Sequence, residues 1–387
     1  REDISECDEI IKVRVLEEEQ LDAENYDQIY KAKLQNTIRY AQSVPYIKKR
    51  AQEYYEEAVA YRESAQNSRL PSLARKLTVV SETSRILKFP AHTGRVNRIS
   101  FRPNTQEFAT CSTSKDVKIW PILNFVGSYS ISQHGDHILG CEHSLDGRYL
   151  ATASRDGKAR IWDLDVREKG PRELYGHSER VTDVAFCPTN SVVATSSDDC
   201  TVRVWDLESD RDPLVLRKHN AWVRSVAFSA CGELLVSSSA DNTAVIWDWK
   251  NEIDRCTCIG HQGFVYEAAF VNEASEVVTG SLDGTVKFWN STNGAEIQVE
   301  DAGAHLDAVT SLSATSDGSL LATGSSDGSV ILWDPLSRRP TRQLVHPERS
   351  INAVRLSPDG RFLVTGSVER IDLAGPESHG EVSLWRL

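Results

Sequence analysis

The sequence predicts an all-β protein built from seven similar units, preceded by a short, mainly α-helical segment. Seven tryptophans end β-like runs at spacings of 42, 43, 42, 42, 44 and 52 residues: Trp120, Trp162, Trp205, Trp247, Trp289, Trp333 and Trp385. Seven histidines keep the same register at spacings of 42, 43, 42, 42, 44 and 41 residues: His92, His134, His177, His219, His261, His305 and His346. The run between successive histidines reads as four short strands, and a fixed period of this size indicates a repeat architecture.

The third unit, "HSERVTDVAFCPTNSVVATSSDDCTVRVWDLESDRDPLVL", shows how its strands are recognised. Residues 181–186 alternate as a strand, and "CPTN" is turn chemistry. A second strand at 191–197 meets a third at 201–207 through the tight turn "DDC", and a fourth begins in "DPLVL". Short β-branched runs at even spacing, separated by turn signals, are typical of an all-β array.

Residues 1–76 are of another kind. Tyrosines and aliphatic residues recur there at helical spacing, as in Tyr26, Tyr30 and Leu34. Pro45 interrupts this pattern and suits the first turn of a second helix, 46–64. We predict a helical extension that either packs on its own domain or forms a partner-docking arm, a role that suits its tyrosine-rich faces. The chain begins at Arg1 and contains no methionine, so we expect native methionines to be missing from this sequence.

The repeats resemble the WD-repeat β-propeller family in their Gly-His and Trp-Asp signatures, as in "YGHSERV…VWD" and "IGHQGFV…FWN". The resemblance covers Leu77 to Leu387 and implies seven blades of four strands around a central channel. The last repeat stops at "EVSLWRL", so its fourth strand is missing. We assign that strand to Thr78–Phe89, which would close the ring and remove an open sheet edge.

The resemblance also implies a buried hydrogen-bonded chain in each repeat, made of the His, a second-strand Ser, the turn Asp and the Trp. The sets are His177, Ser197, Asp199, Trp205; His219, Ser239, Asp241, Trp247; His261, Ser281, Asp283, Trp289; His305, Ser325, Asp327, Trp333; and His134, Ser154, Asp156, Trp162. Five near-copies indicate a scaffold, because a catalytic triad would occur once, and the chain has no G-x-S-x-G elbow. We therefore expect no enzyme activity.

Two repeats depart from this pattern. The first has Ser114 where the Asp belongs, and the seventh has His379 there. The seventh also carries an insertion, Val368 to Ser378, which is either a tolerated surface loop or a binding loop.

A partner site is expected on the face that carries the His loops, where this family usually binds. The candidate residues flank the apolar residue four past each His or precede a turn Asp: Arg95, His137, Arg155, Arg180, Trp222, Arg224, Phe264 and Tyr266. Trp, Tyr and Arg are enriched at binding hot spots. An arginine arc on an acidic protein suits an acidic or arginine-seeking segment of another protein, or a carboxylate. The alternative is that the aromatics only cap the channel and the arginines are solvated surface.

Bulk properties exclude several classes of function. The net charge of −12 argues against direct nucleic-acid binding, which needs a basic stripe, and against electrostatic membrane binding. No apolar run is long enough to span a bilayer. The eight cysteines form no CxxC pair, so we expect no metal, no disulfide framework and no cofactor, and we place the chain in the cytosol or nucleus.

The leading hypothesis is a non-enzymatic scaffold or adaptor in an intracellular multiprotein complex. One alternative is a substrate receptor of a cullin-type ubiquitin ligase, although the Trp-Asp-x-Arg ending of such receptors is absent from "WDLD", "WDLE", "WDWK", "WDPL" and "WRL". Another is a G-protein β-like subunit, against which Pro45 argues because it interrupts a single long N-terminal helix.

Overall fold

The computed structural model describes residues 78–79, 85–122, 128–166, 169–209, 211–299, 305–315, 318–346, 349–369 and 379–387. All of these belong to one compact unit, Leu73–Leu387. The predicted helices of residues 1–76 lie outside the described residues, and so does most of the insertion at 368–378. Their predicted roles therefore stay predictions.

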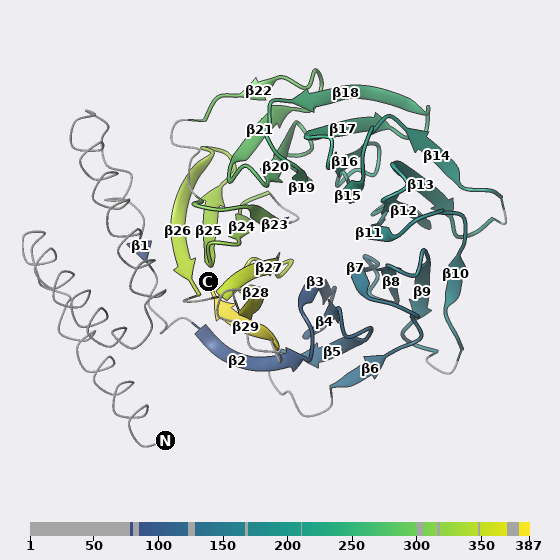
Figure 1. Ribbon diagram of the computed structural model, residues 1–387, viewed down its shortest axis with the longest axis horizontal. Coiled ribbons are helices and arrows are strands. Elements are labelled where there is room, and N and C mark those ends of the chain that lie inside the picture. The colour runs from purple at the N-terminus through teal and green to yellow at the C-terminus, as the bar shows by residue number, and fades with distance from the viewer. Residues whose placement is uncertain are drawn as a thin grey trace, which may run out of the picture. The chain divides into compact units, whose positions relative to one another are not determined.

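The described chain forms seven antiparallel blades around a central channel (Figure 1). In blades one to five the strands run outward from the channel in sequence order, whereas in blades six and seven an earlier strand, β1 (Thr78–Val79) or β2 (Arg85–His92), lies outermost. The predicted all-β, seven-bladed propeller is thus confirmed.

The first three blades are made of consecutive strands. Blade one contains β3 (Val96–Arg102), β4 (Glu107–Ser112), β5 (Val117–Pro121) and β6 (Tyr129–Ile131). Blade two contains β7 (Ile138–His143), β8 (Tyr149–Ser154), β9 (Ala159–Asp163) and β10 (Arg172–Leu174). Blade three contains β11 (Val181–Phe186), β12 (Val192–Ser197), β13 (Thr201–Asp206) and β14 (Leu214–Arg217).

The next three blades follow the same plan. Blade four contains β15 (Val223–Phe228), β16 (Leu235–Ser239), β17 (Thr243–Asp248) and β18 (Ile253–Ile259). Blade five contains β19 (Val265–Val271), β20 (Glu276–Ser281), β21 (Val286–Asn290) and β22 (Glu296–Ile297). Blade six contains β23 (Val309–Ala314), β24 (Leu321–Ser325), β25 (Ser329–Asp334) and β26 (Arg339–Val345), and β1 (Thr78–Val79) pairs in parallel with β26.

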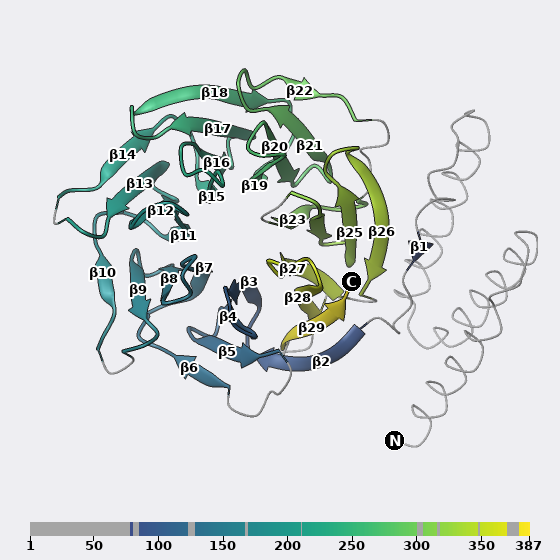
Figure 2. The ribbon, with the colours of Figure 1, turned by 180° about the vertical axis from the view of Figure 1, so that it is seen from behind.

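Blade seven joins the two ends of the described chain. It contains β27 (Arg349–Leu356), β28 (Phe362–Glu369), β29 (Gly380–Arg386) and, outermost, β2 (Arg85–His92). Strands β2 and β29 lie side by side in both views of the ring (Figures 1 and 2) and pair antiparallel, with Phe89 opposite Val382.

The closing strand is shorter at its start than the predicted Thr78–Phe89. The strand that pairs with β29 begins at Arg85, which lies opposite Trp385, and runs to His92 opposite Gly380. Thr78 and Val79 instead extend blade six. Closure by an upstream strand was therefore predicted correctly, but its bounds were wrong.

The core lies between neighbouring blades, where two twisted sheets pack face to face. One cluster joins Val202 and Val204 of blade three to Val226 and Trp247 of blade four. Another joins Val96 and Phe108 of blade one to Val382 and Leu384 of blade seven, together with Leu87 and Phe89 of β2. Each blade therefore depends on both neighbours to bury its apolar faces.

A register shift occurs near the start of every innermost strand. The shift lies between Val181 and Asp183 in β11 and recurs in β3, β7, β15, β19, β23 and β27. A β-bulge redirects side chains at the point where it occurs. In blade three it lets Thr182 donate through Oγ1 to the carbonyl oxygen of Val223 in the next blade, at 2.6 Å.

Candidate functional site

A hydrogen-bonded network links the loop before each blade to the turn between its second and third strands. In blade three, Trp205 donates through Nε1 to Thr195 Oγ1 at 2.9 Å, and Thr195 Oγ1 lies 2.8 Å from His177 Nε2. His177 Nδ1 lies 2.8 Å from a carboxylate oxygen of Asp199. A neutral imidazole that is protonated on Nδ1 satisfies every member, because Asp199 accepts that proton and Nε2 accepts the threonine hydroxyl.

The hydroxyl in the middle of this network is Thr195, and the predicted Ser197 was wrong. Both residues lie on one face of β12, because strand side chains alternate with period two, so the sequence pattern does not distinguish them. Ser197 has a different task, since its Oγ accepts the amide N–H of Asp199 at 3.1 Å and shapes the turn. The central hydroxyls of blades two, four, five and six are Thr152, Ser237, Thr279 and Thr323 in place of Ser154, Ser239, Ser281 and Ser325.

The same geometry recurs in blades four to six. The distance from His Nδ1 to Asp is 2.9 Å for His219 with Asp241 and 2.9 Å for His261 with Asp283. In blade six His305 Nδ1 is 2.8 Å from Ser329 Oγ and 3.7 Å from Asp327. The tryptophan donors Trp247, Trp289 and Trp333 lie 2.9, 2.8 and 2.8 Å from their hydroxyl partners.

The turn carboxylates are held in their charged form. Burial tends to raise the pKa of Asp283, but hydrogen bonds from Thr285, the Gln262 amide and His261 outweigh it and lower the pKa to about 2. The pKa values of Asp199 and Asp241 are also lowered, where hydrogen bonds from His177 and His219 again outweigh burial.

Blade one keeps its carboxylate, two residues later than the pattern places it. His92 Nδ1 lies 3.0 Å from Asp116, and Ser114 Oγ contacts the same carboxylate. Ser114 does occupy the position where the other repeats have Asp, and its contact with Asp116 adds a carboxylate from two residues later to the network.

Blade seven is the exception. Among the residues described there, no carboxylate contacts His346, whose Nε2 lies 3.1 Å from Thr365 Oγ1. Burial, together with the charges of Arg85, Lys88 and Arg349, lowers the pKa of His346 to about 3, so this imidazole is neutral.

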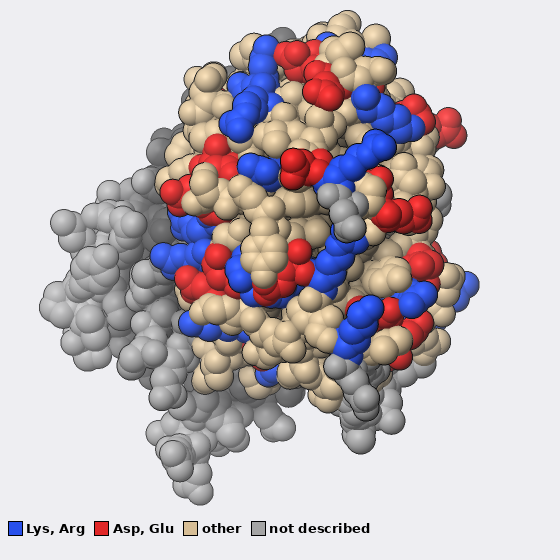
Figure 3. Space-filling model, turned by 90° about the vertical axis from the view of Figure 1, so that its right-hand side faces the viewer, with Lys and Arg blue, Asp and Glu red and all other residues tan. Residues whose placement is uncertain are grey.

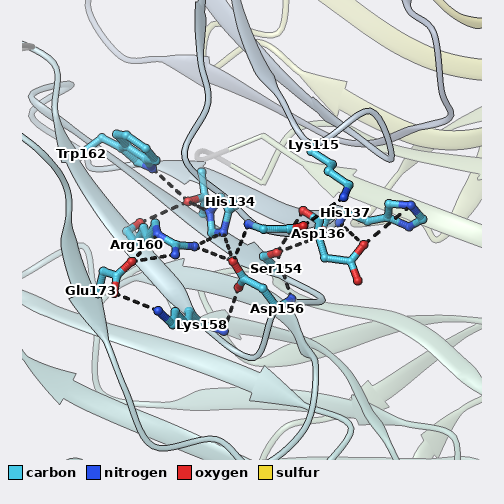
Figure 4. Close-up of polar contacts among 12 residues, drawn as sticks. Lys115, His134, Asp136, His137, Ser154, Asp156, Lys158, Arg160, Trp162 and Glu173 are labelled. Atoms are coloured by element: carbon cyan, nitrogen blue, oxygen red, sulfur yellow. Dashed lines mark hydrogen bonds and ion pairs between the residues drawn. The ribbon is translucent and has the colours of Figure 1, made fainter.

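Blade two adds a cation that the sequence reasoning missed (Figure 4). Arg160 donates to Asp156 at 2.8 Å, contacts His134 and pairs with Glu173 at 2.6 Å. Burial and the Arg160 charge lower the pKa of His134 to about 4. Lysine or arginine at the same position of other blades, as in Lys118 and Arg203, hides this role in the sequence.

The predicted partner residues lie on the face of the His loops, and four of them form two stacked pairs. The Arg180 guanidinium lies 5.6 Å from the ring centre of Trp222, and the Arg224 guanidinium lies 5.6 Å from that of Tyr266. The side chains of Trp222 and Phe264 are 46% and 39% exposed. Large aromatics left this open on one face indicate a binding surface.

The remaining predicted residues fall into two groups. His137 and Arg155 both lie near Asp136, at 3.8 and 3.7 Å, so the charge of Arg155 is partly neutralised on blade two. Arg95 hydrogen-bonds Asn97 at 3.0 Å. The Arg95 side chain is exposed, but desolvation by the surrounding atoms and then the like charge of Arg224 lower its pKa.

Three residues of this face were not among the predicted site residues. Leu306 is 94% exposed and Leu282 is 43% exposed, on blades six and five. Leu306 follows its His directly, where blades three to five have the polar Ser178, Asn220 and Gln262, so the sequence did hold a signal. Asp198 is buried and pairs with Arg180 at 2.5 Å, and burial raises its pKa.

Comparison with known proteins agrees with this architecture. The family model "WD domain, G-beta repeat" matches residues 83–121, 126–163, 169–206, 213–248, 254–290, 299–334 and 338–371, which is more than half of the chain. The chain belongs to the WD40 family. The predicted resemblance is thereby confirmed.

Individual relatives match over part of their length. The chain is 34% identical over 26% of its length to a Denticleless protein homolog of Gallus gallus, of which it covers 15%. It is 27% identical over 41% of its length to mitochondrial division protein 1 of Schizosaccharomyces pombe, of which it covers 26%. It is 30% identical over 32% of its length to the U5 small nuclear ribonucleoprotein 40 kDa protein of Dictyostelium discoideum, of which it covers 34%.

In this WD40 ring, ion pairs cross the channel below the mouth. Arg98 of blade one pairs with Asp183 of blade three at 2.7 Å and with Glu267 of blade five. The two carboxylates outweigh burial and raise the pKa of Arg98. Arg355 of blade seven pairs with Glu142 of blade two at 3.1 Å. The charged side chains below the mouth of the channel therefore neutralise one another.

Other kinds of site were sought over the same residues. Within the described ranges, no His, Cys, Asp and Glu side chains group in a way that could hold a metal ion, and no helix is long and apolar enough to cross a membrane. On the side of the ring seen in Figure 3, Lys and Arg are interspersed with Asp and Glu, so that side carries no basic stripe.

Proposed function

We propose that this WD40 chain is a non-enzymatic scaffold or adaptor that holds protein partners in an intracellular complex. It binds one partner through the face of the His loops, with Trp222, Arg224 and Tyr266 at the centre of the site. The observation that carries the proposal is the half-exposed Trp222, which stacks with Arg180, together with the second pair, Arg224 and Tyr266.

The stacking makes these arginines effective binding groups. A free arginine loses side-chain entropy when a partner immobilises it. Arg180 and Arg224 already lie over aromatic rings. Arg180 is also paired with Asp198, so Arg224 is the guanidinium that can stack and still donate to a partner's carboxylate at its edge. An acidic segment is therefore the partner that this surface favours.

The repeated networks support a scaffold in preference to an enzyme. His, Asp and hydroxyl side chains recur with similar geometry in successive blades, and their hydrogen bonds are all consumed in fixing the turns. A side chain whose hydrogen bonds are already satisfied within the fold is poorly placed to activate a substrate.

The names of two relatives support the proposal that this chain acts within a multiprotein complex. One relative is a component of a U5 small nuclear ribonucleoprotein, and another is a U4/U6 small nuclear ribonucleoprotein PRP4-like protein. These names favour a nuclear location within the proposed intracellular range, cytoplasmic or nuclear.

The test is quantitative affinity purification of the full chain with Trp222→Ala plus Tyr266→Ala. We expect this variant to lose at least one partner by about thirtyfold in affinity, because truncating an anchor costs about 2 kcal/mol. Tyr175→Ala is the matched control, since Tyr175 is a 61% exposed aromatic that precedes the His177 loop and lies outside the patch. Identical partner sets for the wild type and the double variant, with both folded, would refute this site.

A further inference from the structure

The two arginines at the channel mouth differ from the other arginines of this face in having no anionic partner. Arg180 has Asp198 at 2.5 Å, and Arg155 has Asp136 at 3.7 Å. Among the described residues, neither Arg95 nor Arg224 has a carboxylate within ion-pair distance. Both arginines therefore lack a direct ion pair, although the Asp198 carboxylate acts on Arg224 at longer range.

Both arginines lie at the mouth of the channel, above carboxylates that are already paired. Arg95 comes from the loop before β3, and Arg224 is the second residue of β15, in blades on different sides of the ring. The carboxylates of Asp183 and Glu267 below are already engaged by Arg98. An anion seated between Arg95 and Arg224 would convert their repulsion into two charge-assisted hydrogen bonds.

On blades five and six the character of the face changes from cationic to apolar. Phe264, Leu282 and Leu306 are 39%, 43% and 94% exposed. These side chains come from loops of adjacent blades, and no arginine or lysine stands among the equivalent positions there. An exposed apolar patch beside a charged one indicates a partner that carries both characters.

We propose that the partner segment is a peptide stretch of another protein that carries a carboxylate, seated between Arg95 and Arg224, next to aliphatic or aromatic side chains that cover Phe264, Leu282 and Leu306. This inference rests on the proposed function and specifies the chemistry of the bound segment. The polarity of the face sets its orientation, with the acidic part over the channel mouth and the apolar part over blades five and six.

The experiment is a selection of displayed random peptides on the full chain, followed by affinity measurements on synthetic copies. We expect the enriched peptides to contain Asp or Glu at a fixed distance from aliphatic or aromatic residues. Arg95→Gln plus Arg224→Gln should weaken them roughly tenfold or more, with a smaller salt dependence. Leu282→Ser plus Leu306→Ser should weaken them by a similar factor without changing the salt dependence.

A double-mutant cycle tests whether the peptide's carboxylate binds to Arg95 and Arg224. Replacing the enriched acid of the peptide by Asn should cost the wild type roughly tenfold and should cost the Arg95→Gln plus Arg224→Gln variant almost nothing. Equal losses for both proteins would overturn the inference. Enrichment of basic peptides, of peptides without an acid, or of none at all would overturn it as well.

Binding of the selected peptides to the Trp222→Ala plus Tyr266→Ala variant separates this inference from the proposed function. If Trp222→Ala plus Tyr266→Ala abolishes binding of peptides that lack the acidic and apolar pattern, the site stands and the inference falls. If that variant binds every enriched peptide as well as the wild type does, the site itself is refuted, and the inference falls with it.

Discussion

Replacing Asp283 by alanine is expected to destabilise the propeller by about 1–3 kcal/mol. Asp283 accepts four hydrogen bonds, from His261 Nδ1 at 2.9 Å, the Gln262 amide at 2.8 Å, the Thr285 amide at 2.9 Å and Thr285 Oγ1 at 2.6 Å. The loss depends on how many of these donors find another partner when the carboxylate is gone.

The donors differ in their access to water. Gln262 is exposed, so its amide can bond to solvent, whereas His261 is 6% exposed and its Nδ1–H faces the blade. Thr285 Oγ1 lies 3.2 Å from His261 Nδ1 and offers partial compensation. One buried donor, partly compensated, therefore accounts for most of the expected loss. Adding Thr285→Val removes the compensation and should move the loss toward the upper end of the range.

The assay is chemical denaturation, comparing midpoints at neutral pH. The control is Glu179→Ala, which removes the same charge from an exposed side chain; Glu276 is unsuitable because it accepts hydrogen bonds from Arg338. Equal midpoints for Asp283→Ala and Glu179→Ala would refute the role assigned to the turn carboxylate.

Three further outcomes are expected. Because the folded pKa of Asp283 is lowered to about 2, its contribution is present above pH about 4 and is lost as pH falls toward 2, so denaturation midpoints of Asp283→Ala and wild type should converge over that range. A chain beginning at Leu77 should stay soluble, whereas one beginning at Ala91 lacks most of β2, exposes the edge of β29 and should aggregate in light scattering. Arg98→Met leaves two buried carboxylates facing the channel and should lower the free energy of unfolding by about 3–5 kcal/mol. Adding Asp183→Asn and Glu267→Gln to Arg98→Met should largely restore it in the same denaturation assay. No restoration would mean that the ion pairs do not explain the loss.

Part of the candidate site could be predicted because it repeats. Trp222, Arg224, Phe264 and Tyr266 were found by counting from the His of each repeat, and the structure places them on one face with two cation–aromatic stacks. Counting in this way succeeds because each blade repeats the same backbone path, so a sequence offset translates into a position on the ring.

Other features of the site depend on contacts that no offset encodes. Arg95 and Arg224 belong to blades one and four, and only the closed ring brings the charge of Arg224 near enough to lower the pKa of Arg95. Leu306 was overlooked because it is aliphatic, although its exposure makes it a binding candidate.

The sequence by itself determined the number of blades, the family, the face that carries the His loops and the His, Asp and Trp members of most networks, because these follow from a local period and from strand alternation. Only the tertiary structure decided that Thr195 and not Ser197 joins His177 to Trp205, and that Asp116 serves blade one. It also decided that the closing strand beside β29 begins at Arg85, and that Arg98 reaches Glu267 across the channel. The physical reason is the same in each case: two side chains on the same face of a strand, or on opposite sides of a ring, have equivalent places in the sequence pattern, and only closure of the ring selects the pair within hydrogen-bonding distance.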